Sequence, residues 1–138
     1  MLAQTTIKSF DEGCDSLLIN KKLRYIGILD KMGNLIFEKE QQGISSTMSD
    51  KKSRSLYIQS VLEILLQKDF DEQIGSLKYD VSHRTKMDII TIPVFDHVIL
   101  ISVEPKENTD LIANNAIDIF DKIFDKNNYL YNQKDSYK

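Results

Sequence analysis

Hydrophobic residues recur at helical spacing in two separate segments, one toward each end of the chain. The N-terminal stripe consists of Ile7, Phe10, Cys14, Leu17 and Leu18. The C-terminal stripe follows good N-cap residues at 108–110 and consists of Ile112, Ala116, Ile119, Phe120, Ile123 and Phe124. Positions three, four and seven residues apart share one face of a helix, so each stripe predicts an amphipathic helix packed on a core.

A third helical segment, from Ser53 to about Lys68, is apolar over more than one face. Its widest stripe, which we expect to face the core, consists of Tyr57, Ile58, Val61, Leu62, Leu65 and Leu66. Leu56 and Ile64 lie outside this stripe. A helix with an extra apolar face usually packs on a second partner. We therefore expect Leu56 and Ile64 to contact a second copy of the chain.

Five short runs between the helices have the patterns of β-strands, and they are residues 25–29, 35–37, 77–82, 87–94 and 98–103. The first two flank a turn sequence at 30–34, which predicts a hairpin. The third alternates apolar with polar residues, as a half-exposed edge strand does. The first, fourth and fifth are apolar at nearly every position, which is typical of central strands covered on both faces.

The order of the elements predicts an α+β fold. Because the apolar runs belong at the centre, the sequence favours one five-stranded antiparallel sheet of order 2-1-5-4-3, with one helix on one face and two on the other. The 138 residues, 41% hydrophobic and 28% charged, suffice for one core without disulfides. We assign residues 1–126 to this single domain. Residues 127–138 are expected to form a polar, frayed C-terminal tail.

Four short sequence patterns lie on these predicted elements. Cys14 is on the first helix, and residues 24–27 read Arg-x-x-Gly at the first strand. Residues 79–86 read Tyr-x-x-Ser-x-Arg-x-Lys, and Glu104 with Pro105 ends the last strand. In its element order, nearly the whole chain resembles the roadblock/LC7 domain, a member of the profilin- and longin-like group. The four patterns are similar to those of a family of small archaeal proteins.

The roadblock resemblance implies a homodimer without enzymatic activity, in which second helices pair and third strands pair. It thus adds Tyr79 and Val81, on the third strand, to Leu56 and Ile64 as candidate dimer-interface residues. It also implies a scaffolding or regulatory role, with a small GTPase or another signalling protein as partner. The polar insert at 39–52 and the tyrosine-rich tail are departures that this fold does not require.

Candidate catalytic or metal-binding residues are few. Cys14 lies on an apolar helical stripe, so core filling is the main interpretation and a reactive thiol is the alternative. His83 and His97 lie in predicted turns, so solvated side chains are the main interpretation and a metal ligand or base is the alternative. No glycine-rich phosphate-binding motif occurs in the sequence. We therefore predict no catalytic residue, no metal site and no cofactor.

Arg84 and Lys86 are the basic residues most suited to contact a partner. They lie in the hairpin beside the predicted edge strand, where they could meet an acidic partner or a phosphate. The alternative is that their charge protects the edge strand against aggregation.

The overall charge narrows the class of partner. A formal net charge of -3 gives no reason to expect nucleic acid or an anionic membrane. No apolar run approaches the roughly 20 residues of a membrane span, so we expect a cytoplasmic protein. The leading hypothesis is a non-enzymatic, homodimeric interaction module.

The alternative function is a sensory domain of the PAS or GAF kind, which holds a small molecule between sheet and helix. Such a domain needs a cavity on the order of a few hundred Å³ with convergent polar groups. The inward positions of this chain are mostly Ile, Leu, Val and Phe, which favours a filled core instead. An enzyme ranks third, because the sequence offers no nucleophile paired with a base.

Overall fold

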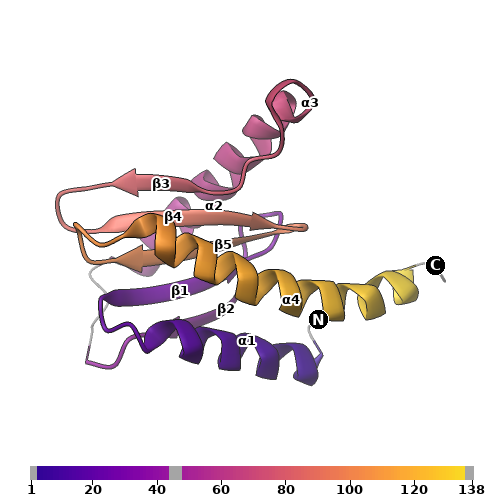
Figure 1. Cartoon of the computed structure of the whole chain (residues 1–138), viewed down its shortest axis with the longest axis horizontal. Coiled ribbons are helices and arrows are strands. Elements are labelled where there is room, and N and C mark those ends of the chain that lie inside the picture. The colour runs from indigo at the N-terminus through magenta and orange to yellow at the C-terminus, as the bar shows by residue number, and fades with distance from the viewer. Residues whose placement is uncertain (1–2, 44–47, 136–138) are drawn as a thin grey trace.

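Five antiparallel strands form one sheet in the order β2-β1-β5-β4-β3 (Figure 1). The structure is a computed structural model that describes residues 3–43 and 48–135, with side chains described as far as residue 125. The strands are β1 (Leu23–Leu29), β2 (Leu35–Glu40), β3 (Asp80–His83), β4 (Asp88–Val94) and β5 (His97–Val103). This order confirms the prediction, since the three most apolar strands occupy the centre.

Two helices cover one face of the sheet and one helix covers the other, as predicted. Helices α1 (Gln4–Leu18) and α4 (Thr109–Asp135) lie side by side on the first face (Figure 1). Helix α2 (Asp50–Gln67) lies on the second face and continues through η1 (Lys68–Phe70) into α3 (Asp71–Ile74). The backbone of α4 passes residue 126, and the division of the chain into domain and tail at that point stays a prediction.

Helix α2 begins three residues before the predicted start. Ser49 is its N-cap, and the Ser49 side chain accepts a hydrogen bond from the backbone N–H of Lys52. Residues 50–52 are polar, so the apolar periodicity does not reveal this first turn. The capping signal of Ser49 followed by Asp50 was the available clue.

The larger core lies between the sheet and the helices α1 and α4. Phe10 of α1 and Phe120 of α4 are fully buried there. The two helices are in close contact at Gly13, where an added Cβ would lie 2.9 Å from Ile123 Cδ1 and 3.0 Å from Ile119 Cγ2. The glycine costs helix propensity, about 1 kcal/mol relative to alanine. Its missing side chain lets α4 pack against α1.

The smaller core lies under α2 and corrects the assignment of faces on that helix. Ile64 is only 4% exposed and packs with Tyr57 and Val61 against β4 and β5, while Leu56 is partly buried at the same cluster. Our expectation that Ile64 and Leu56 face outward is therefore wrong. The exposed apolar residues of α2 are instead Ile58, Leu62, Leu65 and Leu66.

Gln41, directly after β2, ties the end of α1 to the sheet. Its side chain is buried, and its Nε2 donates to the backbone oxygens of Leu18 at 3.0 Å and Leu23 at 3.1 Å. The Leu18 carbonyl ends α1, where helix geometry leaves carbonyl groups without partners, and the Leu23 carbonyl begins β1.

We expect Gln41→Ala to lower the free energy of unfolding by about 1–3 kcal/mol, because it leaves buried carbonyl oxygens without a donor. Urea denaturation followed by circular dichroism measures the change. Gln42→Ala, at an exposed position one residue away, is the matched control and should leave the unfolding midpoint unchanged. Equal midpoints for the two variants would show that Gln41 is not a structural link.

Candidate functional site

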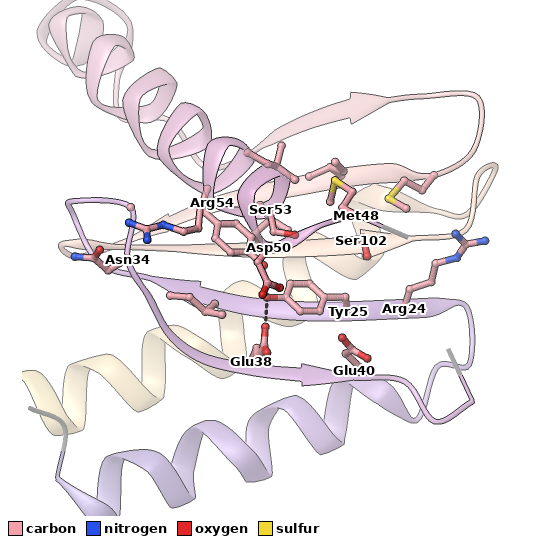
Figure 2. A pocket seen from close by; sticks show the side chains of 17 residues that line it. Arg24, Tyr25, Asn34, Glu38, Glu40, Met48, Asp50, Ser53, Arg54 and Ser102 are labelled. Atoms are coloured by element: carbon pink, nitrogen blue, oxygen red, sulfur yellow. Dashed lines mark hydrogen bonds between the residues drawn. The ribbon is translucent and has the colours of Figure 1, made fainter. Parts of the chain in front are cut away.

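A pocket opens on the face of the sheet that carries α2. A helix with its side chains is about 10–12 Å wide and strands lie about 4.8 Å apart, so one helix covers roughly two strands. Helix α2 packs on β5 and on the adjoining parts of β1 and β4, and the surface of β1 and β2 beside its first turns stays open. The result is a cavity of about 550 Å³, which we call the α2 pocket (Figure 2).

The residues that line the α2 pocket come from the sheet and from the first half of α2. Strand register sets two rows across the sheet: Glu40 pairs with Tyr25 and Tyr25 with Ser102, while Glu38 pairs with Gly27 and Gly27 with Leu100. The lining thus changes from charged at β2 to mostly apolar at β4 and β5, where Ser102 is a polar exception. From the helix, Asp50, Ser53, Arg54, Leu56 and Tyr57 complete the wall.

Tyr25 occupies the centre of this surface because Gly27 leaves room for its ring. A Cβ at Gly27 would lie 2.9 Å from the Tyr25 hydroxyl oxygen. The ring therefore lies along β1, and its hydroxyl donates to Glu38 Oε2 at 2.7 Å (Figure 2). The Tyr57 hydroxyl is 2.8 Å from that of Tyr25. Since Tyr25 gives its only hydroxyl hydrogen to Glu38, Tyr57 must be the donor of this second bond.

This chain of hydrogen bonds keeps the Tyr25 phenol neutral. Burial raises the pKa of Tyr25 well above its ordinary value, and its hydrogen bonds to Tyr57 and Glu38 raise it further. A phenolate at this position would be desolvated and adjacent to a carboxylate. Tyr25 is therefore a stable hydrogen-bond donor to Glu38 and not a general base.

The charged groups of the pocket differ in whether they are already paired with another residue. Arg24 is held by Glu104, whose Oε1 lies 2.8 Å from Nη2 and 2.9 Å from Nε. Arg54 lies at the opposite end of the pocket from Arg24 (Figure 2). Three carboxylates, those of Glu38, Glu40 and Asp50, line the space between.

Sequence reasoning missed this pocket. The Arg-x-x-Gly pattern at residues 24–27 was the available signal, because it contains both Arg24 and the glycine that accommodates Tyr25. The sequence predicts the second strand over residues 35–37 only, so Glu38 lies just beyond its end and Glu40 lies in the polar insert at 39–52. In the structure β2 continues to Glu40 and brings both side chains to the pocket.

A second candidate site is the outer face of α2 and its continuation. Six large apolar side chains, each between 43% and 81% exposed, follow one another along α2, η1 and α3. We call this surface the α2–α3 apolar face, and it consists of Ile58, Leu62, Leu65, Leu66, Phe70 and Ile74. In Figure 1 the end of α2 and α3 project beyond the edge of the sheet. Of the six, Ile58 also lies against the turn between β1 and β2, where an added Cβ at Gly33 would be 3.0 Å from Ile58 Cγ1.

The remaining predicted site residues lie near β3, the edge strand next to α2. Tyr79 and Val81 are partly buried against the larger core, and the Tyr79 hydroxyl donates to Asp110 of α4. Arg84 and Lys86 are exposed or partly exposed in the turn between β3 and β4. The structure thus places these four residues together at one edge, away from the residues that line the α2 pocket.

Cys14 and the two histidines show no shared chemistry. Cys14 is fully buried, as predicted for core filling, and burial raises the pKa of its thiol to about 12. His83 is exposed, and its Nδ1 lies 3.0 Å from Asp88 Oδ2. His97 is partly buried against Phe124, which corrects our expectation of a solvated side chain. Among the described residues, no three His, Cys, Asp or Glu side chains could hold a metal ion.

His97 makes stability depend on pH. Burial lowers its pKa below the ordinary 6.5, although Asp96 and Asp30 oppose the shift. The unfolded chain therefore takes up a proton at higher pH than the folded chain. We expect His97 to contribute its full share to the free energy of unfolding above about pH 6.5. This contribution should decrease as the pH falls below 6.5 toward the lower pKa of the folded state.

Urea denaturation at a series of pH values between neutral and mildly acidic measures this effect. His97→Phe removes the titrating group and should flatten the profile in that window. Gln42→Ala, at an exposed position without a titrating group, is the control and should keep the wild-type slope. If His97→Phe keeps that slope as well, the assignment to His97 is wrong.

Solved structures share this fold. The gliding protein MglB of Thermus thermophilus matches with a TM-score of 0.75 at 13% identity, over 91% of this chain and 96% of that one. Myxococcus xanthus MglB matches with a TM-score of 0.69 at 17% identity, over 91% and 95%. A roadblock/LC7 domain from Streptomyces avermitilis matches with a TM-score of 0.62 at 6% identity, over 85% and 93%. The protein therefore has a roadblock/LC7 fold, which confirms the resemblance.

Sequence comparison also identifies the family. The model for the family of unknown function DUF6659 matches residues 2–130, and the chain belongs to this family. No curated protein matches the sequence. Within the described residues, every helix is too short or too polar to cross a membrane.

Proposed function

We propose that this protein is a non-enzymatic interaction module that forms a homodimer through the α2–α3 apolar face. The observation that carries the proposal is the run of six exposed apolar side chains along α2, η1 and α3. A contiguous exposed apolar surface of this kind marks an interaction site in a folded protein. Two copies of a helix related by two-fold symmetry bury such a face against itself.

Strand β3 extends the proposed interface. It pairs only with β4 in the described part of the chain, so its other edge presents free backbone groups. Tyr79 and Val81 pack inward on the larger core, and they contribute to an interface through their backbone more than through their side chains. The roadblock resemblance implies the same pairing of second helices and third strands.

The partners beyond a second copy are inferred from the resemblance alone. A small GTPase or another signalling protein is the proposed partner, and Arg84 and Lys86 are the proposed contact for an acidic surface. A solved MglB has a tetrameric arrangement, so relatives of this fold assemble further. The cytoplasm as the location stays a prediction.

The test is the solution mass of the purified chain, measured by light scattering after size exclusion over about a hundredfold dilution. Two chains of 16.0 kDa give an expected mass of about 32 kDa. Dissociation on dilution should yield 16.0 kDa, with one transition between the two values. A mass of 16.0 kDa at every concentration would reject the homodimer.

The second candidate function is the sensory domain, and the α2 pocket favours it. Its volume of about 550 Å³ is within the range of small-molecule sites, about 300–1,000 Å³. It also holds convergent polar groups, which the sequence did not lead us to expect. A dimer and a ligand pocket are compatible, because the pocket is lined from the first half of α2 and most of the apolar face lies on the second half and on α3.

A further inference from the structure

The α2 pocket has an excess of negative charge. Glu38 and Glu40 stand two residues apart on β2 and thus project on the same face, about 6.6 Å apart along the strand. Asp50 adds a third carboxylate from the first turn of α2. Arg24 is neutralised by Glu104, and Arg54 is the remaining cation of the lining. Three carboxylates against one available guanidinium leave a charge of about −2 at neutral pH.

The carboxylate of Glu38 is held in place while part of it stays free. Glu38 Oε2 accepts the hydrogen bond from the Tyr25 hydroxyl, which itself accepts one from Tyr57. Among the described residues, neither Glu38 Oε1 nor the carboxylate of Glu40 accepts a hydrogen bond or joins an ion pair. Glu38 Oε1, on a carboxylate that Tyr25 holds, and the exposed carboxylate of Glu40 are therefore two acceptors at the pocket without a donor from the described residues. Ionised acceptors form the strongest hydrogen bonds with cationic donors.

The rest of the pocket suits an alkyl chain and a cationic head. Ile89, Leu100 and Leu56 provide an apolar surface on the side away from β2. The ring of Tyr25 lies between this surface and the two glutamates, and an aromatic face attracts a cation. A bare metal ion would use the carboxylates alone and leave the apolar half of the pocket empty.

From this arrangement we propose that the α2 pocket binds an alkylammonium group, with Glu38 and Glu40 as the acceptors of its N–H donors. The same chemistry occurs in a free primary amine and in a lysine side chain of a partner protein. Tyr25 is a positioning residue, because it acts on the ligand through Glu38. The proposal does not depend on the homodimer.

Two-dimensional NMR of the ¹⁵N-labelled protein, titrated with n-butylammonium chloride, tests the free-amine arm. The lysine arm uses a pentapeptide with a central lysine, and the same peptide with a central glutamine is its control. We expect saturable shifts at residues of β1, β2 and the first turns of α2 with at least one of the two ammonium probes. Inorganic phosphate, an anion, is the probe of opposite charge. Shifts at the pocket with phosphate and with neither ammonium probe would overturn the proposal.

Substitutions separate the two glutamates from general surface charge. Each of Glu38→Gln and Glu40→Gln removes one charge with little change in shape and should weaken binding about tenfold, the effect of one charged hydrogen bond. Tyr25→Phe should weaken it less, and Glu40→Gln should still reduce binding in that background. Glu12→Gln, at an exposed position on α1, is the matched control and should bind as the wild type does.

Equal affinities for Glu38→Gln, Glu40→Gln and Glu12→Gln would reject the proposal. The solution mass of each NMR sample is recorded as well. A monomer that still binds an ammonium probe would reject the homodimer alone, and a dimer that binds neither probe would reject the ligand alone.

Discussion

Replacing both Leu62 and Leu66 with glutamate is expected to convert the proposed homodimer into a folded monomer. Leu62 is 52% exposed and Leu66 is 59% exposed, so replacing either side chain removes few apolar contacts within its own chain. Burial of a leucine at an interface contributes about 1.5–3 kcal/mol, and two-fold symmetry removes this from both copies at once. We therefore expect the dissociation constant to rise at least about a thousandfold.

Analytical ultracentrifugation over a concentration series measures the dissociation constant, and circular dichroism verifies the fold. Ile19→Glu is the matched control, because Ile19 is 76% exposed at the C-cap of α1, which lies on the other face of the sheet against β1 and β2. It should leave the dimer intact. If the double variant stays dimeric, or if Ile19→Glu dissociates the dimer, the interface lies elsewhere on the molecule.

Ile64→Glu is expected to unfold the protein or nearly so. Ile64 is 4% exposed and packs in the smaller core under α2. A glutamate there would bury an unpaired carboxylate and also lose the apolar contacts of the isoleucine. We expect a loss of about 4 kcal/mol or more, compared with a total stability of about 5–15 kcal/mol for a domain.

Urea denaturation of Ile64→Glu and Ile64→Val measures this effect. The valine variant keeps the site apolar and should lose only about 0.5–1.5 kcal/mol. A variant Ile64→Glu that keeps its stability and dissociates the dimer would instead restore our first assignment of the face. These outcomes differ because a core position affects folding at every protein concentration, whereas an interface position affects the mass alone.

The order of the strands could be predicted because it depends on how each strand is covered. A central strand is buried on both faces and must be apolar throughout, as β1, β4 and β5 are over most of their length. An edge strand such as β3 is partly solvated, and residues 77–82 alternate apolar with polar side chains. The apolar pattern of each strand therefore indicates how many of its faces are buried. The strand order can be predicted from these patterns without knowing which strands lie beside each other.

The faces of α2 could not be predicted in the same way. This helix carries apolar side chains on two faces, and periodicity cannot show which of them meets the sheet. The structure resolves the choice through the sheet side chains beneath the helix, where Tyr57, Val61 and Ile64 meet Leu29, Ile89 and Leu100. His97 is a similar case, because it lies in a turn by sequence and becomes buried only when Phe124 of α4 packs against its ring.

The sequence by itself determined the α+β class, the five-stranded order, the two helices on one face and the buried Cys14. Each of these follows from the local spacing of apolar residues, because each helix or strand buries its own apolar side chains away from water. Only the tertiary structure decided the α2 pocket and the α2–α3 apolar face. The pocket exists because one helix is too narrow to cover five strands and because Gly27 makes room for Tyr25. Both depend on distances between elements far apart in the chain, which no local pattern contains.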